Sequence, residues 1–377
     1  MLLNNNNIQR WIGSCVVITA LLLALSCGGG GGTDPQPGTG NGKVALFITD
    51  NISFYKQVVA TITGIRLVNS GTGGICEVLG TPVTLDIANL TNMAQYVNLA
   101  QCPAGHYNRI DIEFRRSVHL MDQLDETSAC AFTSFIHESG ERRSLACNPD
   151  TGICTLGIRG GDRDGSVLVQ EDRYNDLGID FDLKKFTVAD FGNPSACSVT
   201  MTVYPVSATD MNSSGRAHSV TGGITDLDVA ADTFVLSAGT TTLTVDYSGI
   251  LPSLQPNIDT LLVAAQADGL SVNVLTGDVD LATRSISANR IFVKAAGTVS
   301  GVKGQPQQLS FVLTYQPAHQ PEKTIAGSLK PQTDDQGSFV DGAWVNVTFD
   351  GYDDDDKKAA YLAAAIEVLP AGTVIDD

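Results

Sequence analysis

The sequence predicts an all-β protein, with an N-terminal antiparallel β-sandwich followed by two tandem small β-barrel or β-sandwich modules. Three observations support this prediction. Charged residues make up only 17% of the 377 residues, while Gly, Thr, Ser and Val are common and helical periodicity is rare, a composition typical of strands and turns. Several segments alternate apolar and polar residues with a period of two. The C-terminal half repeats itself at spacings of 73 to 77 residues, which indicates duplicated modules.

Residues 1–26 have the pattern of a secretory signal peptide, with Arg10 followed by ten mostly apolar residues at Val16–Leu25. Ten helical residues span about 15 Å, so this run is too short for a bilayer core of about 30 Å. The stretch Ala24-Leu25-Ser26-Cys27 resembles a bacterial lipobox. The resemblance implies that Cys27 carries palmitate-type acyl chains and becomes the N-terminus of a membrane lipoprotein. The alternative is an ordinary signal peptide that happens to contain a cysteine.

Residues 27–43 are predicted to be a flexible stem, because they are rich in glycine and contain no large apolar side chain. As a flexible linker the stem spans roughly 20–25 Å. In lipoproteins of Gram-negative bacteria, an aspartate after the acylated cysteine retains the protein at the inner membrane. By resemblance to them, Gly28 at this position implies an outer-membrane lipoprotein, at the periplasmic face or the cell surface.

The charge balance excludes some partners. The net charge is −18, and removal of residues 1–26 takes away Arg10 and no acid, which makes it −19. Such a balance opposes binding to nucleic acid and to anionic membrane surfaces. We therefore expect no nucleic-acid partner and contact with the membrane only through the lipid anchor, leaving a polysaccharide or another envelope protein as the expected partner.

Six cysteines follow Cys27, and all lie before residue 200. An even number in an oxidising compartment predicts three disulfides, although the sequence does not choose among the fifteen pairings of six cysteines. The eight residues from Cys147 to Cys154 contain the turn sequence Asn-Pro-Asp-Thr-Gly. Closing this loop is worth about 2.5 kcal/mol on the chain-entropy model. A redox role is the alternative, but no flanking residue would lower a thiol pKa. The candidate disulfide cysteines are Cys76, Cys102, Cys130, Cys147, Cys154 and Cys197.

The first folded domain is predicted at residues 44–211. Tyr107–Arg115 and Leu177–Leu183 alternate most clearly, with Asp180 and Asp182 expected on the wet side of the second segment. Gly64 interrupts another segment at a position that favours a bulge. The other expected strands are Val44–Asp50, Gln57–Asn69, Pro82–Ile87 and Ser198–Val206.

Within this domain the segments VALFITD, VVATITGIRLV, VTLDIANL, CPAGHYNRIDIEF, LGIDFDLKKF and VTMTVYPV occur in order. Together they resemble the bacterial lipoprotein family described as domain of unknown function 4382, over about residues 43–211. The most specific part is Pro103–Tyr107. That family has no established activity, so the resemblance implies a domain boundary and no chemistry. Four of the cysteines, from Cys130 onward, lie outside the matching motifs.

The duplicated half is divided into modules at residues 216–295 and 296–370. TFVLS at 233–237 is echoed by SFVLT at 310–314, and GLSVNV at 269–274 by GAWVNV at 342–347. ISANRIFVK at 286–294 is echoed by YLAAAIEVL at 361–369. The last segment has high helix propensity, but the repeat register predicts a strand. Residues 278–285 and 350–358 are expected at hairpin tips.

This pair resembles a second bacterial family, described as domain of unknown function 5666. In that family a Gly-x-Val-x-Val strand precedes a hairpin and a terminal strand of the Ala-x-x-Ile-x-Val type. The second copy departs further from the pattern than the first. The matching positions of the first copy are Gly269, Val272, Val274, Ala288, Ile291 and Val293.

No residue is predicted to be catalytic, cofactor-binding or metal-binding. The histidines at 106, 119, 137, 218 and 319 have no metal-site spacing and are expected to be scattered on the surface. Gly160–Gly165 lacks the ligands of a calcium loop and is interpreted as a solvated turn, and Asp353–Lys357 as a solvated charge run.

The sequence favours a non-catalytic binding, scaffolding or adhesion protein of the envelope. The alternative is a hydrolase of an envelope or extracellular polymer that uses Asp180 and Asp182 as paired carboxylates.

Overall fold

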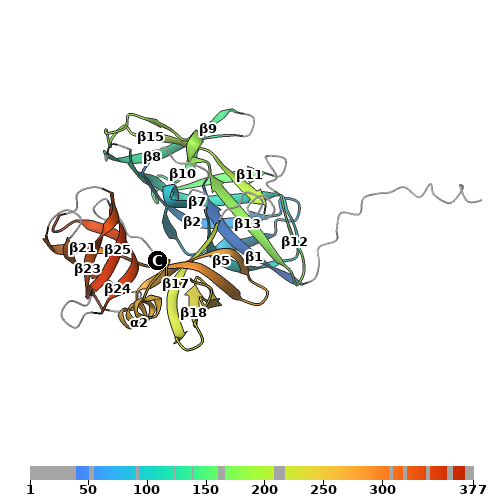
Figure 1. Ribbon diagram of the computed structural model, residues 1–377. Helices are drawn as coiled ribbons and strands as arrows, with labels where there is room; N and C mark the ends of the chain where they lie inside the picture. Colours follow the sequence, from blue (N-terminus) through green and yellow to red (C-terminus); the bar gives the residue numbers. More distant parts are fainter. Residues whose placement is uncertain are drawn as a thin grey trace, which may run out of the picture. The chain divides into compact units, whose positions relative to one another are not determined.

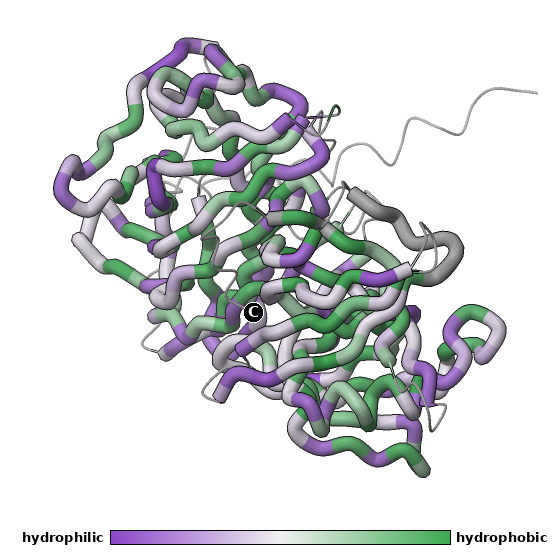
Figure 2. The backbone as a smooth tube through the Cα atoms, turned by 90° about the vertical axis from the view of Figure 1, so that its left-hand side faces the viewer, coloured by the Kyte–Doolittle hydropathy of each residue, from purple (hydrophilic) through white to green (hydrophobic). Residues whose placement is uncertain are grey.

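The computed structural model describes residues 40–50, 55–90, 93–122, 124, 126–137, 140–159, 166–207, 217–304, 309–316, 321–336, 340–354 and 360–369. These residues form an almost entirely β structure, as the sequence predicts (Figure 1). Along the strands hydrophobic and hydrophilic residues alternate (Figure 2). The signal peptide, Cys27, most of the stem, Gly160–Gly165, His319 and Lys357 lie outside the described residues.

The N-terminal domain is a sandwich of two sheets packed around one core. One sheet has the order β16-β13-β1-β5, and the facing sheet is centred on β7, which pairs with β2, β8 and β11. Side chains of both sheets meet in one apolar cluster that includes Leu46, Ile112 and Phe132. The first sheet comprises β1 (Asn41–Thr49), β5 (Met93–Pro103), β13 (Tyr174–Phe181) and β16 (Val203–Ser207).

The facing sheet is built from ten strands. They are β2 (Gln57–Val68), β3 (Ile75–Leu79), β4 (Val83–Asp86), β7 (Arg109–Met121), β8 (Thr127–Ile136), β9 (Arg142–Ser144), β10 (Ala146–Cys147), β11 (Ile153–Arg159), β14 (Thr187–Ala189) and β15 (Ser198–Met201). The short elements between them are η1 (Ile87–Leu90), η2 (Leu183–Lys185) and the paired strands β6 (Gly105–Tyr107) and β12 (Val167–Val169).

The predicted alternation is confirmed in β7, where Ile110, Ile112 and Phe114 are buried. The predicted bulge is also present, because the β2–β7 register shifts immediately before Gly64. The sandwich is not purely antiparallel, however. Strand β1 pairs with β13 in parallel, and β15 pairs with β8 in parallel.

Two boundaries differ from the prediction. The stem was expected to reach Lys43, but β1 begins at Asn41, and Gly42 lies so close to the Gln170 carbonyl that a Cβ would be 2.2 Å from it. The segment Ser198–Val206 was expected to be one strand. It divides at Thr202 into β15 and β16, which belong to opposite sheets, because the chain crosses the sandwich there.

The C-terminal half begins as a continuation of the first sheet, since β17 (Ala217–Asp228) pairs in parallel with β5. The next strands form a closed circuit of pairings, in which β17 pairs with β18, β18 with β19, β19 with β21, β21 with β20, and β20 with β17. This is a five-stranded barrel with the pairing order of an OB-fold. The further strands are β18 (Thr233–Ala238), β19 (Thr241–Asp246), β20 (Ser271–Asp280) and β21 (Ser285–Lys303).

A second barrel repeats this circuit through β21, β22, β23, β25 and β24. The two barrels share β21. The first part of this strand is the last strand of the first barrel, and its second part is the first strand of the second barrel. The predicted module boundary at 295/296 therefore falls inside one strand. The predicted strand at the C-terminal end is confirmed as β25. The added strands are β22 (Ser310–Tyr315), β23 (Lys323–Gln336), β24 (Trp344–Asp353) and β25 (Ala360–Leu369).

The registers confirm the predicted alignment of the repeats. In the first barrel Val272 pairs with Val293 and Val274 with Ile291. In the second barrel Val345 pairs with Val368 and Val347 with Ile366. The expected equivalence of Ile366 with Ile291, and of Val368 with Val293, therefore holds.

One helix, α2 (Ile258–Asp268), is present among the described residues and was not predicted. It connects β19 to β20, buries Leu261, Leu262 and Ala265, and lies next to β24 of the second barrel (Figure 1). The Tyr361 hydroxyl donates to Asp268 Oδ2 at 2.7 Å, and Lys323 Nζ donates to the Asp268 carbonyl at 2.9 Å. A cation at a helix C-terminus is electrostatically favourable, so these contacts fasten α2 to the second barrel.

Three disulfides form, as the cysteine count predicts: Cys76–Cys102, Cys130–Cys197 and Cys147–Cys154. The second joins β8 to the segment that enters β15, and the third closes the β10–β11 hairpin. Disulfides persist in oxidising compartments, so the protein folds outside the reducing cytosol. Within the described part of the chain, none of the helices has the length and apolar character needed to cross a membrane.

Candidate binding groove

A groove of about 680 Å³ lies on the surface of the sheet that joins the N-terminal domain to the barrels. Its floor crosses the neighbouring strands β5, β17, β20, β21 and β24. Its side wall comes from β3, β4 and η1. The groove is therefore formed by strands of the sandwich and of both barrels.

The floor is a row of polar side chains, which we call the polar row. Along β17 the polar residues alternate with Val220, whose side chain is in the barrel core. The polar row therefore lies on the outer surface of the barrel wall and crosses five neighbouring strands, with two residues on β17 and one on each of the others. It consists of Gln95, Ser219, Thr221, Asn273, Lys294 and Asn346.

Hydrogen bonds hold this row in place before any ligand arrives. Asn273 is buried, and its Nδ2 donates to Ser219 Oγ at 2.6 Å and to Thr221 Oγ1 at 2.8 Å. At the rim, Thr240 Oγ1 donates to Asn98 Oδ1 at 2.9 Å, and Asn98 Nδ2 donates to the Val78 carbonyl at 2.7 Å. Side chains fixed in this way lose little further entropy when they bind.

The side wall is mostly apolar, with Leu79, Pro82, Val83 and Leu90 among its residues. Its one carboxylate, Asp86, has a structural role. Asp86 Oδ1 accepts from the Val58 and Ala88 amides at 2.8 and 3.1 Å, and Oδ2 accepts from Asn89 Nδ2 at 2.9 Å. The groove thus offers amides, hydroxyls and one ammonium group opposite an apolar wall.

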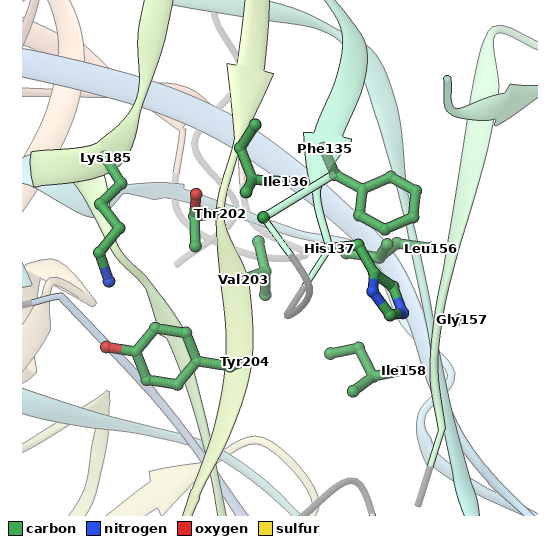
Figure 3. Close-up of a pocket in the computed structure, with 11 residues that line it drawn as sticks. Phe135, Ile136, His137, Leu156, Gly157, Ile158, Lys185, Thr202, Val203 and Tyr204 are labelled. Atoms are coloured by element: carbon green, nitrogen blue, oxygen red, sulfur yellow. The ribbon is translucent and has the colours of Figure 1, made fainter. Parts of the chain in front are cut away.

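The paired carboxylates Asp180 and Asp182 lie elsewhere, and their predicted place on a wet strand face is wrong. Their exposed fractions are 1% and 2%. Consecutive residues at the end of β13 are all buried, so both faces of the strand are covered there. Asp182 forms a close ion pair with Lys185, whose ammonium also lies 5.6 Å from the centre of the Tyr204 ring. Figure 3 shows Lys185 and Tyr204 on the same side of a small neighbouring cavity.

The described histidines do not assemble into a site. His106 is exposed, and His119 and His137 are half-buried. Burial lowers the pKa of His119. His218 is buried, contrary to the expected surface position, and its Nδ1–H donates to the Gly277 carbonyl at 3.2 Å. Among the described residues no group of three His, Cys, Asp or Glu side chains has a metal-binding arrangement.

Sequence reasoning missed the groove, although it found the strands that form its floor. The polar row is contributed by positions far apart in the chain, and each residue alone has the pattern of an ordinary outward-facing strand residue. Helix α2 left a clearer signal, since Pro256 precedes an Ala- and Leu-rich run that ends at Gly269 in the left-handed region.

Comparison with known proteins gives a family match for the N-terminal domain. Residues 41–199 match the family model "Domain of unknown function (DUF4382)", which confirms the family expected there. No curated protein matches the chain. Among solved structures, the crystal structure of Ag(I)CusF is 21% identical and aligns over 21% of this chain and 97% of its own, with a TM-score of 0.17. Drosophila Unr CSD456 is 14% identical over 61% of this chain and 90% of its own, with a TM-score of 0.15.

Proposed function

We propose that this protein is an envelope-anchored, non-catalytic binding protein whose groove holds a neutral polysaccharide. The observation that carries the proposal is the polar row. Its partly exposed members are Gln95, Thr221, Lys294 and Asn346, which offer amide, hydroxyl and ammonium groups to a ligand beside an apolar wall. The buried Ser219 and Asn273 hold Thr221 in position. A sugar ring likewise combines hydroxyl groups with an apolar face.

The charge of the chain narrows the choice of ligand. OB-fold barrels bind oligonucleotides or oligosaccharides chiefly on the face of their second and third strands. The groove floor instead uses the first, fourth and fifth strands of the first barrel, so the choice of ligand rests on the polar row and on the charge. The net charge of −18 opposes a polyanion, which leaves the oligosaccharide. A groove whose floor crosses both barrels provides contacts to several successive sugar units of one chain, and neighbouring contacts on one polymer reinforce each other as intramolecular events.

The anchor completes the proposal. Cys27, in its lipobox-like context, would carry the acyl chains that hold the protein at the outer membrane, and the glycine-rich stem would keep the folded part away from the lipid surface. The duplicated barrels would be two copies of domain of unknown function 5666. A second envelope protein is the other partner that such a groove could accept.

The hydrolase alternative depends on Asp180 and Asp182, and their burial counts against it. A general acid or base must come within hydrogen-bond distance of the substrate proton. Two carboxylates that are 99% and 98% covered, one of them paired with Lys185, offer no such approach.

The test is affinity electrophoresis of the mature chain carrying Cys27→Ser, in gels containing neutral polysaccharides such as dextran and soluble envelope glycans. We expect retardation by at least one neutral polymer. The double variant Thr221→Val/Lys294→Met should weaken binding about tenfold, the loss of roughly 1.4 kcal/mol. The matched control is Thr244→Val, an exposed β19 threonine that does not line the groove. No retardation by any neutral polymer, or equal retardation of the double variant, would contradict the proposal, and cleavage of the polymer that is lost in Asp180→Asn would favour the hydrolase.

A further inference from the structure

A second concavity lies inside the N-terminal domain, apart from the groove. It is a cavity of about 140 Å³ at the margin of the sandwich, between the end of β8, β11, η2 and β16. Its wall is mainly apolar and includes Phe135, Leu156, Ile158 and Val203. Figure 3 shows Lys185 and Tyr204 on one side of this cavity and His137 and Ile158 on the other.

The size of the cavity limits what it can hold. An apolar cavity of about 150 Å³ in another protein accommodates benzene, so a group of one aromatic ring or a few methylenes fits here. One polar atom in the wall has unmet hydrogen-bonding capacity. Thr202 is 6% exposed, and its Oγ1 has no hydrogen-bond partner among the described residues. A buried hydroxyl without a partner is unfavourable unless something else binds it.

The cavity adjoins a basic hollow on the outer surface of the sheet. His137 and Gly157 line both spaces, so the cavity and the hollow are adjacent at these two residues. The hollow is otherwise lined by Arg109, Arg143, Arg159 and Asp111. Three arginines gathered at one point stand out in a chain with a net charge of −18.

The close placement of these arginines destabilises the folded protein when no anion is bound to them. Arg109 and Arg159 are directly opposite each other in the β7–β11 register, and like charges at opposed positions destabilise a sheet. Asp111 pairs with Arg109 at 2.9 Å, and Glu141 pairs with Arg143 at 3.1 Å. Arg159 is exposed and forms no ion pair with any described residue. The hollow therefore has cationic hydrogen-bond donors available for an anion.

From these observations we infer that this site binds a small amphiphilic carboxylate, with its apolar group in the cavity and its carboxylate at the arginines. Arginine matches carboxylate geometry with two parallel N–H donors, and the apolar group gains free energy by leaving water. The inference concerns a site separate from the polysaccharide groove and does not depend on it.

The experiment is isothermal titration of the mature chain carrying Cys27→Ser with 3-phenylpropanoate and with hexanoate, without detergent. The neutral probes 3-phenylpropanol and hexanol report the apolar contribution alone. We expect the carboxylates to bind at least tenfold more tightly than the alcohols. Arg143→Gln/Arg159→Gln should remove that difference, whereas the exposed control Arg115→Gln on β7 should keep it.

A second variant tests the cavity itself. Val203→Phe places a larger side chain in the cavity and should abolish binding of both carboxylates and alcohols, while binding of polysaccharide in the groove is unchanged. A thermal melt with a transition as sharp as that of the parent verifies that the variant is folded. The inference is overturned if neither carboxylate binds, if carboxylates and alcohols bind equally, or if both variants bind as the parent does.

Discussion

Gly222 and Gly297 occupy the same place in the two barrels. At each position a Cβ atom would lie 2.1 Å from a carbonyl oxygen of the neighbouring strand, that of Ser237 in the first barrel and that of Thr314 in the second. The strands approach too closely for any side chain, as happens at tight bends of small barrels. Both barrels therefore require glycine at this position.

This relationship predicts that Gly222→Ala and Gly297→Ala each destabilise the protein, by about 2–3 kcal/mol for a clash that the backbone must relieve. Gly223→Ala is the matched control, because nothing lies within 4 Å of its would-be Cβ. Urea unfolding followed by circular dichroism measures the difference. A stability loss of the same size for all three variants would show that the close approach is not the cause.

The disulfides are expected to differ in how much each one stabilises the folded protein. Removal of Cys130–Cys197, with a sequence separation of 67, should cost about 4 kcal/mol, and removal of Cys147–Cys154, with a separation of 7, about 2.5 kcal/mol on the chain-entropy model. Paired Cys→Ala variants, compared by their urea midpoints, measure this order. Alkylation of the denatured parent should find no free thiol, and two or more titratable thiols would refute the three-disulfide state.

Helix α2 should depend on the contact between Tyr361 and Asp268. Tyr361→Phe removes the hydroxyl and leaves Asp268 Oδ2 without its buried donor, which should cost about 1–2 kcal/mol. The control is Tyr352→Phe, since Tyr352 packs against Tyr361 edge to face. Both variants keep the ring, so an equal loss of stability in thermal melts would show that the Tyr361 hydrogen bond contributes nothing.

Stability should fall at alkaline pH. Burial raises the pKa of Tyr96, Tyr247, Tyr315 and Tyr361, and the carboxylate of Asp268 raises that of Tyr361 further. A raised folded-state pKa favours the neutral phenol, so the stabilisation is complete below the unfolded value of about 10 and is lost as pH rises above it. Urea midpoints measured from pH 8 to 11 should decline above about pH 10, with a smaller decline in Tyr361→Phe. A flat profile would contradict this prediction.

The lipid anchor is tested in cells. Radiolabelled palmitate should enter the protein, and Cys27→Ala should abolish both labelling and membrane retention, because Cys27 is the expected acyl acceptor. Cys15→Ala, in the leader, is the matched control and should leave both unchanged. A parent protein recovered wholly in the soluble fraction would disprove the lipoprotein prediction.

The sequence by itself determined the all-β class, the disulfide-containing N-terminal domain, the family of that domain and the repeat register, down to the equivalence of Ile366 with Ile291. These properties are encoded locally, by alternation along a strand, by cysteine count and by self-similarity. Only the tertiary structure decided that Asp180 and Asp182 are buried, that β21 serves both barrels and that the polar row forms one groove. Strand periodicity shows that successive side chains point to opposite faces, but which partner covers each face depends on strand order, and strand order is set by contacts between residues far apart in the chain.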